Sequence, residues 1–465
     1  MPLNNKMSTN QKAKSLFYEG AGHIQAGDYS RAEECFKEAI RIAPNFAEAH
    51  ANLGFILDKK GALREAEIHY RISLKLKQNC LEVYLNLGSL LTTQKRFDEA
   101  WDIYETAVTI APKSPAIWSN LGIFYTCQKL DANAEKCYRR AIELDETYGA
   151  ARFNLSYLLL RHGNFEEGWR YFEARDWYAS LERYFDCPRW RGEPLNAKSM
   201  LIGYEAGHGD MIQFCRYAAV IKSLGASHIT LVCHPALKRL FATLGPVDKI
   251  IAFNEDVPRS GWDFWTPPFS IPYYCKTRAD SIPAEIPYLH PQPDLVAKWE
   301  RELPAQGVRV GLVWKGNPKF ENDSERSIES LDMLKPLGSV PGISFISLQK
   351  GPGENEAMQP IEGLPLIHLG GRIEDFADTA AIITNLDLII CVDTGAAHLA
   401  GALGKPCWVL LPDFVTDWRW LNGRSDSLWY PGVMRLFRQS ETGSWQEVIS
   451  EVAEALKLFA KERRR

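Results

Sequence analysis

The chain has few of the patterns that mark extracellular, membrane or zinc-binding proteins. Its ten cysteines are scattered and form no C-x-x-C pair, which argues against a disulfide framework or a zinc site. No uninterrupted apolar run reaches the ~20 residues that a membrane-spanning helix needs. The first residues also lack the apolar core of a signal peptide. We therefore expect a cytoplasmic protein without a membrane span.

An excess of one charge is also missing. The formal net charge is −4 at pH 7, so no global field would attract nucleic acid or a membrane surface. The 46% hydrophobic and 24% charged residues are typical of globular proteins. At 465 residues the chain is too long for one ordinary domain, and two or three domains are expected.

The amino-terminal part, residues 13–175, carries an internal repeat. Small residues recur every 34 positions, alanine or glycine follows 12 positions later, and an aromatic residue follows four positions after that. The small residues are Gly20, Gly54, Gly88, Gly122 and Ser156, and the aromatic residues are Phe36, Tyr70, Tyr104, Tyr138 and Phe172. This period and these residue types are typical of tetratricopeptide (TPR) repeats, which are paired antiparallel helices stacked into a solenoid.

Asparagines recur at the same period, at Asn52, Asn86, Asn120 and Asn154. In a TPR groove such residues can bind the backbone of an extended peptide, so they are candidates for an acceptor or peptide groove. Hydrogen bonding between helices inside the array is an equally good interpretation.

After a linker at 176–196, apolar runs of strand length predict two α/β halves, at 197–295 and 305–465. In the first half we expect strands at 200–204, 229–232 and 249–253 and a helix at 211–224. In the second we expect strands at 310–314, 345–348, 366–369, 388–391 and 408–411. Helices are expected there at 374–385 and 444–458.

The most informative stretch is Leu386 to Pro412. A buried strand leads into the polar turn Asp393-Thr394-Gly395, a helix follows, and Gly404 and Pro406 stop it before the next strand. In doubly wound sheets ligands bind at such strand ends, and the first N–H groups of the helix can face an anion. A simple helix cap at Asp393 or Thr394 is the alternative.

The run from Asp393 to Pro406 resembles the nucleotide-sugar motif of the heptosyltransferases, glycosyltransferase family nine. It is also similar to bacterial proteins that join TPR repeats to such a transferase of GT-B fold. The resemblance implies that Asp393, Thr394, Gly395 and His398 lie beside the donor diphosphate. The predicted fold class is thus an α solenoid followed by a GT-B fold of two Rossmann-like halves.

A second polar turn, Gly207-His208-Gly209-Asp210, follows the first strand of the amino-terminal half. It fits neither a dinucleotide fingerprint nor a phosphate-binding P-loop. The resemblance implies that Asp210 is the base that takes the acceptor proton. The related TPR-linked proteins have leucine where this chain has His208, so the base stays open between Asp210 and His208. Asp210 could also merely cap the helix.

The chain has no Asp-x-Asp motif, the pair with which metal-dependent transferases hold an ion against the diphosphate. We therefore expect no metal and no cofactor, with the nucleotide sugar as a substrate. Positive side chains would then offset the charge of the leaving group. The candidates lie in loops after strands that match the family, together with one tryptophan that could line the donor pocket: Lys315, Asn317, Arg326, Gln349, Lys350 and Trp418. Core packing is an equally good interpretation of Trp418.

Together with these features, the resemblance implies a metal-independent, inverting glycosyltransferase that acts on a hydroxyl, with a protein or peptide acceptor presented by the TPR groove. O-GlcNAc transferase has a similar architecture. Transfer to lipopolysaccharide or another surface glycan is the alternative. A non-catalytic scaffold with a degenerate transferase half is a third possibility.

Overall fold

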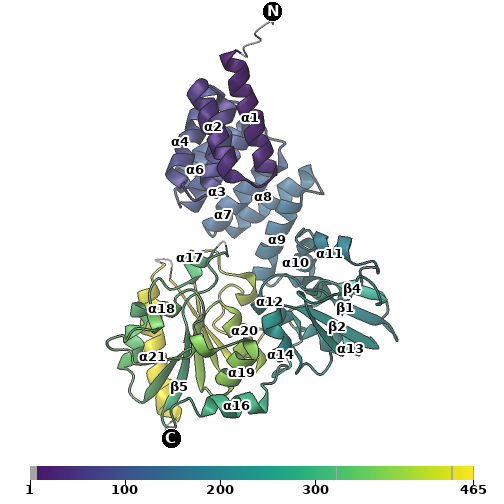
Figure 1. Cartoon of the computed structure of the whole chain (residues 1–465), viewed down its shortest axis with the longest axis vertical. Helices are drawn as coiled ribbons and strands as arrows, with labels where there is room; N and C mark the ends of the chain where they lie inside the picture. The colour runs from purple at the N-terminus through teal and green to yellow at the C-terminus, as the bar shows by residue number, and fades with distance from the viewer. Residues whose placement is uncertain (1–7, 321, 441–442, 464–465) are drawn as a thin grey trace, which may run out of the picture. The chain divides into compact units, whose positions relative to one another are not determined.

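The computed structural model describes residues 8–320, 322–440 and 443–463. The chain forms two compact units, which divide between Leu155 and Ser156 (Figure 1). The predicted fold class is confirmed, because paired helices form the first unit and α/β structure with parallel sheets forms most of the second.

The first unit consists of antiparallel helix pairs. Within the described residues the pairs are α1 (Thr9–Gln25) with α2 (Tyr29–Ile42), α3 (Ala47–Lys59) with α4 (Leu63–Leu76), α5 (Leu81–Thr93) with α6 (Phe97–Ile110), and α7 (Pro115–Cys127) with α8 (Asp131–Leu144). Helix α9 (Gly149–Arg161) begins in this unit and ends in the second.

The repeat marks have the packing role that the pattern predicted. A Cβ added to Gly122 would lie 2.3 Å from Cε1 of Tyr138, and one added to Gly88 would lie 2.6 Å from Cε1 of Tyr104. Any side chain at these glycines would therefore collide with the aromatic ring of the paired helix. The alanines at the neighbouring repeat position, such as Ala66 and Ala100, are fully buried.

The periodic asparagines are all half-buried. Asn120 Nδ2 donates a hydrogen bond of 3.5 Å to the Leu85 carbonyl, which joins α7 to α5. This contact is of the kind expected for bonding inside the array. The role of the asparagines in a peptide groove stays a prediction.

The fifth repeat packs with the transferase part. The second half of α9, helix α10 (Phe165–Phe172) and helix α11 (Ala179–Tyr184) belong to the second unit. Trp169 and Phe172 of α10 are both buried, and their rings lie 5.2 and 6.2 Å from the ring of Trp418. The compact units therefore divide about 20 residues before the expected end of the array, because the aromatic residues of α10 find their partners in the second unit.

The first sheet has strand order β3-β2-β1-β4, with all strands parallel. Its strands are β1 (Ser199–Ile202), β2 (His228–Cys233), β3 (Lys249–Ala252) and β4 (Phe264–Thr266). The predicted strands match β1, β2 and β3, whereas the three-residue β4 was missed. The helical elements of this part are α12 (His208–Phe214), α13 (Tyr217–Ser223), η1 (Pro235–Leu237), α14 (Lys238–Phe241), η2 (Pro268–Ser270), α15 (Ile271–Tyr274) and α16 (Pro293–Glu300).

The helix expected at 211–224 is divided into α12 and α13. Arg216 lies between them, and its Nε donates a hydrogen bond of 2.8 Å to the Gln213 carbonyl. A side chain that occupies a carbonyl of the helix in this way interrupts the regular backbone ladder.

The second sheet has strand order β10-β9-β8-β5-β6-β7, and again all strands are parallel. Its strands are β5 (Val308–Val313), β6 (Ile343–Ser347), β7 (Leu366–His368), β8 (Leu388–Val392), β9 (Cys407–Leu411) and β10 (Met434–Arg438). The helical elements are α17 (Asp323–Arg326), η3 (Leu331–Ser339), α18 (Glu354–Ala357), η4 (Gly370–Arg372), α19 (Phe376–Thr384), α20 (Gly395–Ala402), η5 (Trp418–Trp420) and α21 (Trp445–Arg463). All the predicted strands are present, and β10 was missed.

The terminal helix α21 covers the second sheet. Its apolar residues Val448, Val452 and Leu456 share one core with Leu312 of β5 and Leu334 of η3. The sequence predicted this helix, and its burial explains the amphipathic pattern.

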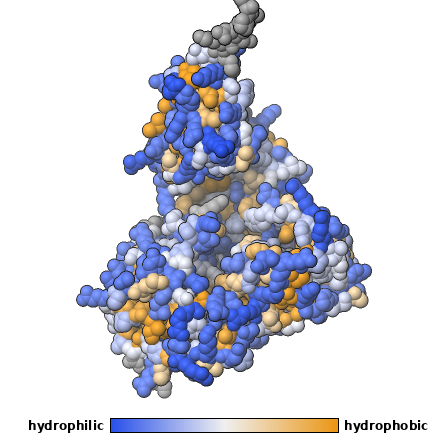
Figure 2. Space-filling model, in the orientation of Figure 1, coloured by the Kyte–Doolittle hydropathy of each residue, from blue (hydrophilic) through white to orange (hydrophobic). Residues whose placement is uncertain are grey.

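No helix among the described residues is long and apolar enough to cross a membrane. Hydrophilic residues are spread over the face of the molecule shown in Figure 2, with smaller apolar areas between them. A mixture of this kind is ordinary for a protein surface in water.

Candidate active site

The two polar turns singled out in the sequence meet in the second unit. Helix α12, which follows β1 of the first sheet, packs against helix α20, which follows β8 of the second sheet. A Cβ added to Gly209 would lie 2.8 Å from Cδ2 of His398 and 3.2 Å from Cα of Gly395. Only glycine at this position allows so close an approach, so the expected acceptor turn and the expected donor turn form one site.

Helix α20 begins at this contact. The side chain of Thr394 makes no capping hydrogen bond, and its Oγ1 is buried without a partner among the described residues. The interpretation as a simple side-chain cap at Thr394 is therefore wrong. A helix start with an unused hydroxyl and small residues at Gly395 and Ala396 suits an anionic ligand.

Asp210 is the acidic group at the contact. Its Oδ2 accepts a hydrogen bond of 2.8 Å from the Gly207 N–H, and its Oδ1 accepts one from Nη2 of Arg419. The first bond is a capping interaction at the start of α12, but the second joins the two halves of the site. The Asp210 side chain is 26% exposed, so a ligand can reach its carboxylate. Burial raises its pKa, and the charge of Arg419 opposes that shift.

Arg419 is the central cation of the site. Its Nη1 donates to both oxygens of Asp417, at 3.0 and 2.9 Å, and its Nε donates to Oε1 of Gln213 at 2.6 Å. The guanidinium also lies 4.5 Å from the ring centre of Trp418. Only 7% of the Arg419 side chain is exposed. All three nitrogens of this guanidinium are thus engaged within the protein.

His208, the alternative base, has a different environment. Its ring lies edge-on to His234 at 4.3 Å and 5.1 Å from the ring of Phe376. Its Nε2 is buried without a partner among the described residues. Burial, together with His234, lowers the pKa of His208 to about 4. The imidazole is therefore neutral at pH 7 and a weaker base than an ordinary histidine.

His398 is buried and stacks on Trp420 at 5.5 Å. Its Nδ1 and the Tyr430 hydroxyl lie 2.9 Å apart. Burial lowers the pKa of His398 well below its usual value, and the nearby arginines lower it further. The ring is therefore neutral at pH 7 and would act on a diphosphate by hydrogen bonding rather than by charge.

Asp393 completes the donor turn. Burial and the neighbouring Asp417 raise its pKa to about 6, although Arg326 and Arg419 lower it. This carboxyl therefore changes charge within the neutral range, unlike an ordinary aspartate.

Two of the predicted cations are engaged away from the contact. Lys315 Nζ pairs with Glu356 at 2.5 Å, and Lys350 Nζ donates to the Ile373 carbonyl at 2.7 Å. Gln349 is almost fully buried and braces the loop after β5, because its Oε1 accepts from the N–H groups of Trp314 and Lys315. These contacts are structural, and the donor role of the three residues stays a prediction.

Asn317 and Arg326 lie in the polar loop after β5. Asn317 Oδ1 accepts from the Lys319 N–H at 3.1 Å in a local turn. Arg326 pairs with Asp323 at 3.0 Å, and its charge acts on Asp210, Asp393 and His398 alike. Arg326 is therefore the predicted cation nearest to the site.

Trp418 does not line an open pocket. It is 1% exposed and packs against Trp169, Phe172 and Trp429. Of the two interpretations of this residue, core packing is the one that the structure supports.

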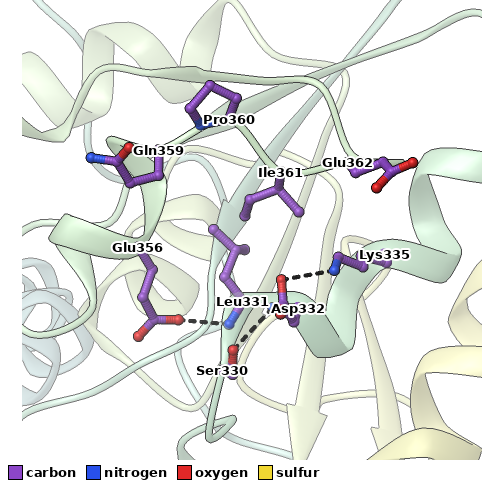
Figure 3. A pocket seen from close by; sticks show the side chains of 9 residues that line it. All are labelled: Ser330, Leu331, Asp332, Lys335, Glu356, Gln359, Pro360, Ile361 and Glu362. Carbon is purple, nitrogen blue, oxygen red and sulfur yellow. Dashed lines mark hydrogen bonds and ion pairs between the residues drawn. The ribbon is translucent and has the colours of Figure 1, made fainter.

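A shallow pocket of about 310 Å³ borders the second sheet (Figure 3). It is lined by Ser330, Leu331, Asp332, Lys335, Glu356, Gln359, Pro360, Ile361 and Glu362. Its one lysine, Lys335, pairs with Asp332 at 3.1 Å. Glu356 pairs with Lys315, so this lining offers a diphosphate no lysine without a carboxylate partner among the described residues.

One group of possible metal ligands occurs among the described residues. It consists of Glu19, His23 and Cys35 in the first helix pair. At the candidate site, the carboxylates of Asp210 and Asp417 both pair with Arg419.

The stretch from Asp417 to Trp420 matches the family in sequence, but only its aromatic residues were considered as candidates, and the sequence analysis missed the polar roles of Asp417 and Arg419 as well as Gln213 and Tyr430. Arg419 lies between Trp418 and Trp420, and these large apolar neighbours indicate that its guanidinium is buried. A buried guanidinium needs several hydrogen-bond partners. Two of the partners, Asp210 and Gln213, are about 200 residues away in sequence, so the pattern alone could not identify them.

Models of known families match several parts of the chain. Tetratricopeptide repeat models match residues 13–46, 81–114 and 115–148, and the model of glycosyltransferase family 9 (heptosyltransferase) matches residues 344–410. The last range contains the donor turn and ends in β9.

The chain is also similar to individual proteins. The protein FlbA of Caulobacter vibrioides is 29% identical over 339 residues, which are 68% of this chain and 56% of FlbA. The chain thus spans little more than half the length of this curated relative. Among solved structures, PilF of Pseudomonas aeruginosa is 23% identical and covers 36% of this chain and 77% of its own, with a TM-score of 0.33. A TPR protein of Thermus thermophilus is 20% identical and covers 37% of this chain and 99% of its own, also with a TM-score of 0.33.

The matches and the paired helices agree with the repeat period, and the family 9 match falls on the sheet that carries the donor turn. The chain therefore joins tetratricopeptide repeats to a domain of glycosyltransferase family 9, which supports glycosyltransferase activity.

Proposed function

We propose that this protein transfers a sugar from a nucleotide sugar to an acceptor hydroxyl, with inversion and without a metal ion. The observation that carries the proposal is the contact of Gly209 with Gly395 and His398. It brings a carboxylate at a strand end of one sheet to an anion-binding turn at a strand end of the other. An acceptor hydroxyl beside Asp210 would then face a sugar whose diphosphate lies at the start of α20.

The roles follow from this arrangement. Asp210 takes the proton of the acceptor hydroxyl as the hydroxyl oxygen attacks the anomeric carbon. The N–H groups at the start of α20, the Thr394 hydroxyl and neutral His398 bind the diphosphate by hydrogen bonds. Arg326 offsets the charge that develops on the leaving group.

We further propose a protein or peptide acceptor held by the repeat array. Its support is the array itself, since TPR solenoids bind extended peptides along a groove. The same contact brings Asp210 of one half to the donor turn of the other half, which favours an enzyme over a scaffold.

The donor site is tested by titrating nucleotide sugars calorimetrically into wild type and Thr394→Val. Valine has nearly the same shape but lacks the hydroxyl. We expect donor affinity to fall by about 10- to 100-fold, the loss of one hydrogen bond to a charged group. The thermal transition of the free protein should stay the same or rise, because the buried hydroxyl has no partner. Thr379→Val, in α19, is the matched control, and equal donor affinity in all three proteins would refute the assignment.

The pH dependence of donor binding provides a second test. The Asp393 carboxyl has a pKa of about 6 in the free protein. Above that pH it carries a negative charge that repels a diphosphate, so donor affinity should fall as pH rises from 5 to 8. A fall of about tenfold corresponds to a donor that raises this pKa by one unit.

Other groups near Asp393 have to be separated from it. The nearby arginines keep their charge over this range, and the low pKa values of His398 and His208 keep both rings neutral. The pKa of Asp210 is raised as well. Asp393→Asn mimics the neutral form, so its affinity should be high and independent of pH. If Asp393→Asn keeps the pH dependence of wild type, Asp393 is not the group that titrates.

A further inference from the structure

Arg419 joins three side chains at the contact between the two halves. Asp210 and Gln213 belong to α12 under the first sheet, whereas Asp417 belongs to the loop after β9 of the second sheet. The Arg419 guanidinium is thus the polar link from the candidate base to the half that carries the donor turn.

The charges around this guanidinium do not cancel. Asp210 and Asp417 both lie within ion-pair distance of Arg419, and Asp393 lies close enough to Asp417 for each charge to affect the other. A partly buried carboxylate next to further carboxylates favours its protonated form, and only a nearby cation reverses that preference. Arg419 is the cation in direct contact with Asp210.

The geometry also fixes the direction of the carboxylate. One oxygen of Asp210 is held by Arg419 and the other by the Gly207 N–H. Each oxygen still has a free lone pair, and the 26% exposure of the side chain leaves room for an acceptor hydroxyl. Nε and Nη1 of Arg419 donate to Gln213 and Asp417, and Nη2 donates to Asp210.

We propose that Arg419 is the positioning residue of the reaction: it keeps Asp210 ionised and oriented for proton abstraction, while Asp417 sets the strength of this effect. The proposal rests on the proposed function, in which Asp210 is the base. It assigns to Arg419 an action through Asp210 and no contact with the substrate.

The proposal predicts shifts of opposite sign in two variants. Arg419→Gln removes the cation, so the apparent pKa of Asp210 should rise by one unit or more. Asp417→Asn removes a competing carboxylate, so the same pKa should fall. A residue with a purely structural role would not produce opposite shifts.

The pKa is measured without any substrate, by carbon NMR of protein labelled at the aspartate carboxyl carbons. The Asp210 signal is identified by its absence in Asp210→Asn. The same variants are then assayed for release of nucleoside diphosphate from the nucleotide sugar that binds most tightly, as a function of pH. We expect the acidic limb of the rate profile to move up in Arg419→Gln and down in Asp417→Asn.

Arg419→Lys provides the conservative variant. It keeps a cation next to Asp210 but loses the two-point contact with Asp417, so it should keep the acidic limb near that of wild type and recover part of the rate. If Arg419→Gln does not fold, Arg419→Lys and Asp417→Asn still test the proposal.

Two outcomes overturn the inference. One is an unchanged pKa of Asp210 in both Arg419→Gln and Asp417→Asn, and the other is a shift of the same sign in both. If the NMR shifts are as expected but the rate does not follow the pKa of Asp210, the base assignment of the proposed function fails instead. The two failures are therefore distinguishable.

Discussion

Asp210→Asn should lower turnover by about 10²- to 10⁴-fold, the usual contribution of a positioned base. Asparagine has nearly the same shape and can still accept the hydrogen bond from the Gly207 N–H, so the start of α12 should be preserved. Donor affinity should change little, because Asp210 contacts the acceptor side of the site. The measurement is the release of nucleoside diphosphate with and without acceptor, together with a donor titration.

His208→Leu is the matched comparison, since leucine is the residue of the related TPR-linked proteins at this position. The low pKa of His208 makes it a poor base, so this variant should keep most of its rate. The reverse result, with Asp210→Asn fully active and His208→Leu inactive, would transfer the role of base to His208. A chelator should leave the wild-type rate unaltered, and loss of turnover with chelator would contradict the metal-free mechanism.

The second large effect concerns stability. Glu205 lies just before the Gly207–Asp210 turn and is almost fully buried. Its Oε1 accepts from Nε of Arg175 at 2.6 Å and from Nε1 of Trp177 at 2.5 Å, and its Oε2 accepts from the Phe269 N–H at 3.2 Å. Glu205→Ala would leave the buried Arg175 without its main partner. We expect the free energy of unfolding to fall by about 3–5 kcal/mol.

Urea unfolding of the whole protein measures this effect. Glu166→Ala is the matched control, because Glu166 forms an exposed ion pair of 2.9 Å with Arg278, worth about 0–1 kcal/mol. The contrast tests whether the segment around Arg175 is part of the transferase fold. Equal losses in the two variants would show that the Arg175–Glu205 pair is not a buried structural element.

The end of the repeat array was difficult to predict from the sequence. The 34-residue period extends to Phe172, so the sequence gives no sign of a change of partner inside the fifth repeat. Phe172 keeps the aromatic residue type of the repeat, but its ring packs against Phe269, and the ring of Trp169 packs against Trp418. Whether a side chain is buried depends on both of the surfaces that meet. A repeat pattern describes only the surface of the repeat.

The candidate site could also be predicted only in part. Glycine-rich turns after buried strands identified Asp210 and the residues from Asp393 to His398, because such turns end strands of parallel sheets. Lys315 and Lys350 were chosen on their position at strand ends, yet Lys315 binds a carboxylate and Lys350 a carbonyl of their own half. The sequence shows that a lysine carries a positive charge, but it does not show which group that charge contacts.

Local sequence patterns were enough to predict the repeat solenoid, the parallel α/β part and the two polar turns. These features depend on local periodicity, on glycine and proline signals, and on apolar runs of strand length, all of which can be read within about 35 residues. The contact of Gly209 with His398 and the hydrogen bond from Arg419 to Asp210 could be found only in the folded protein. The packing of whole sheets sets which groups meet a buried charge. The free energy of a buried ion pair therefore depends on groups that lie about 200 residues apart in the chain.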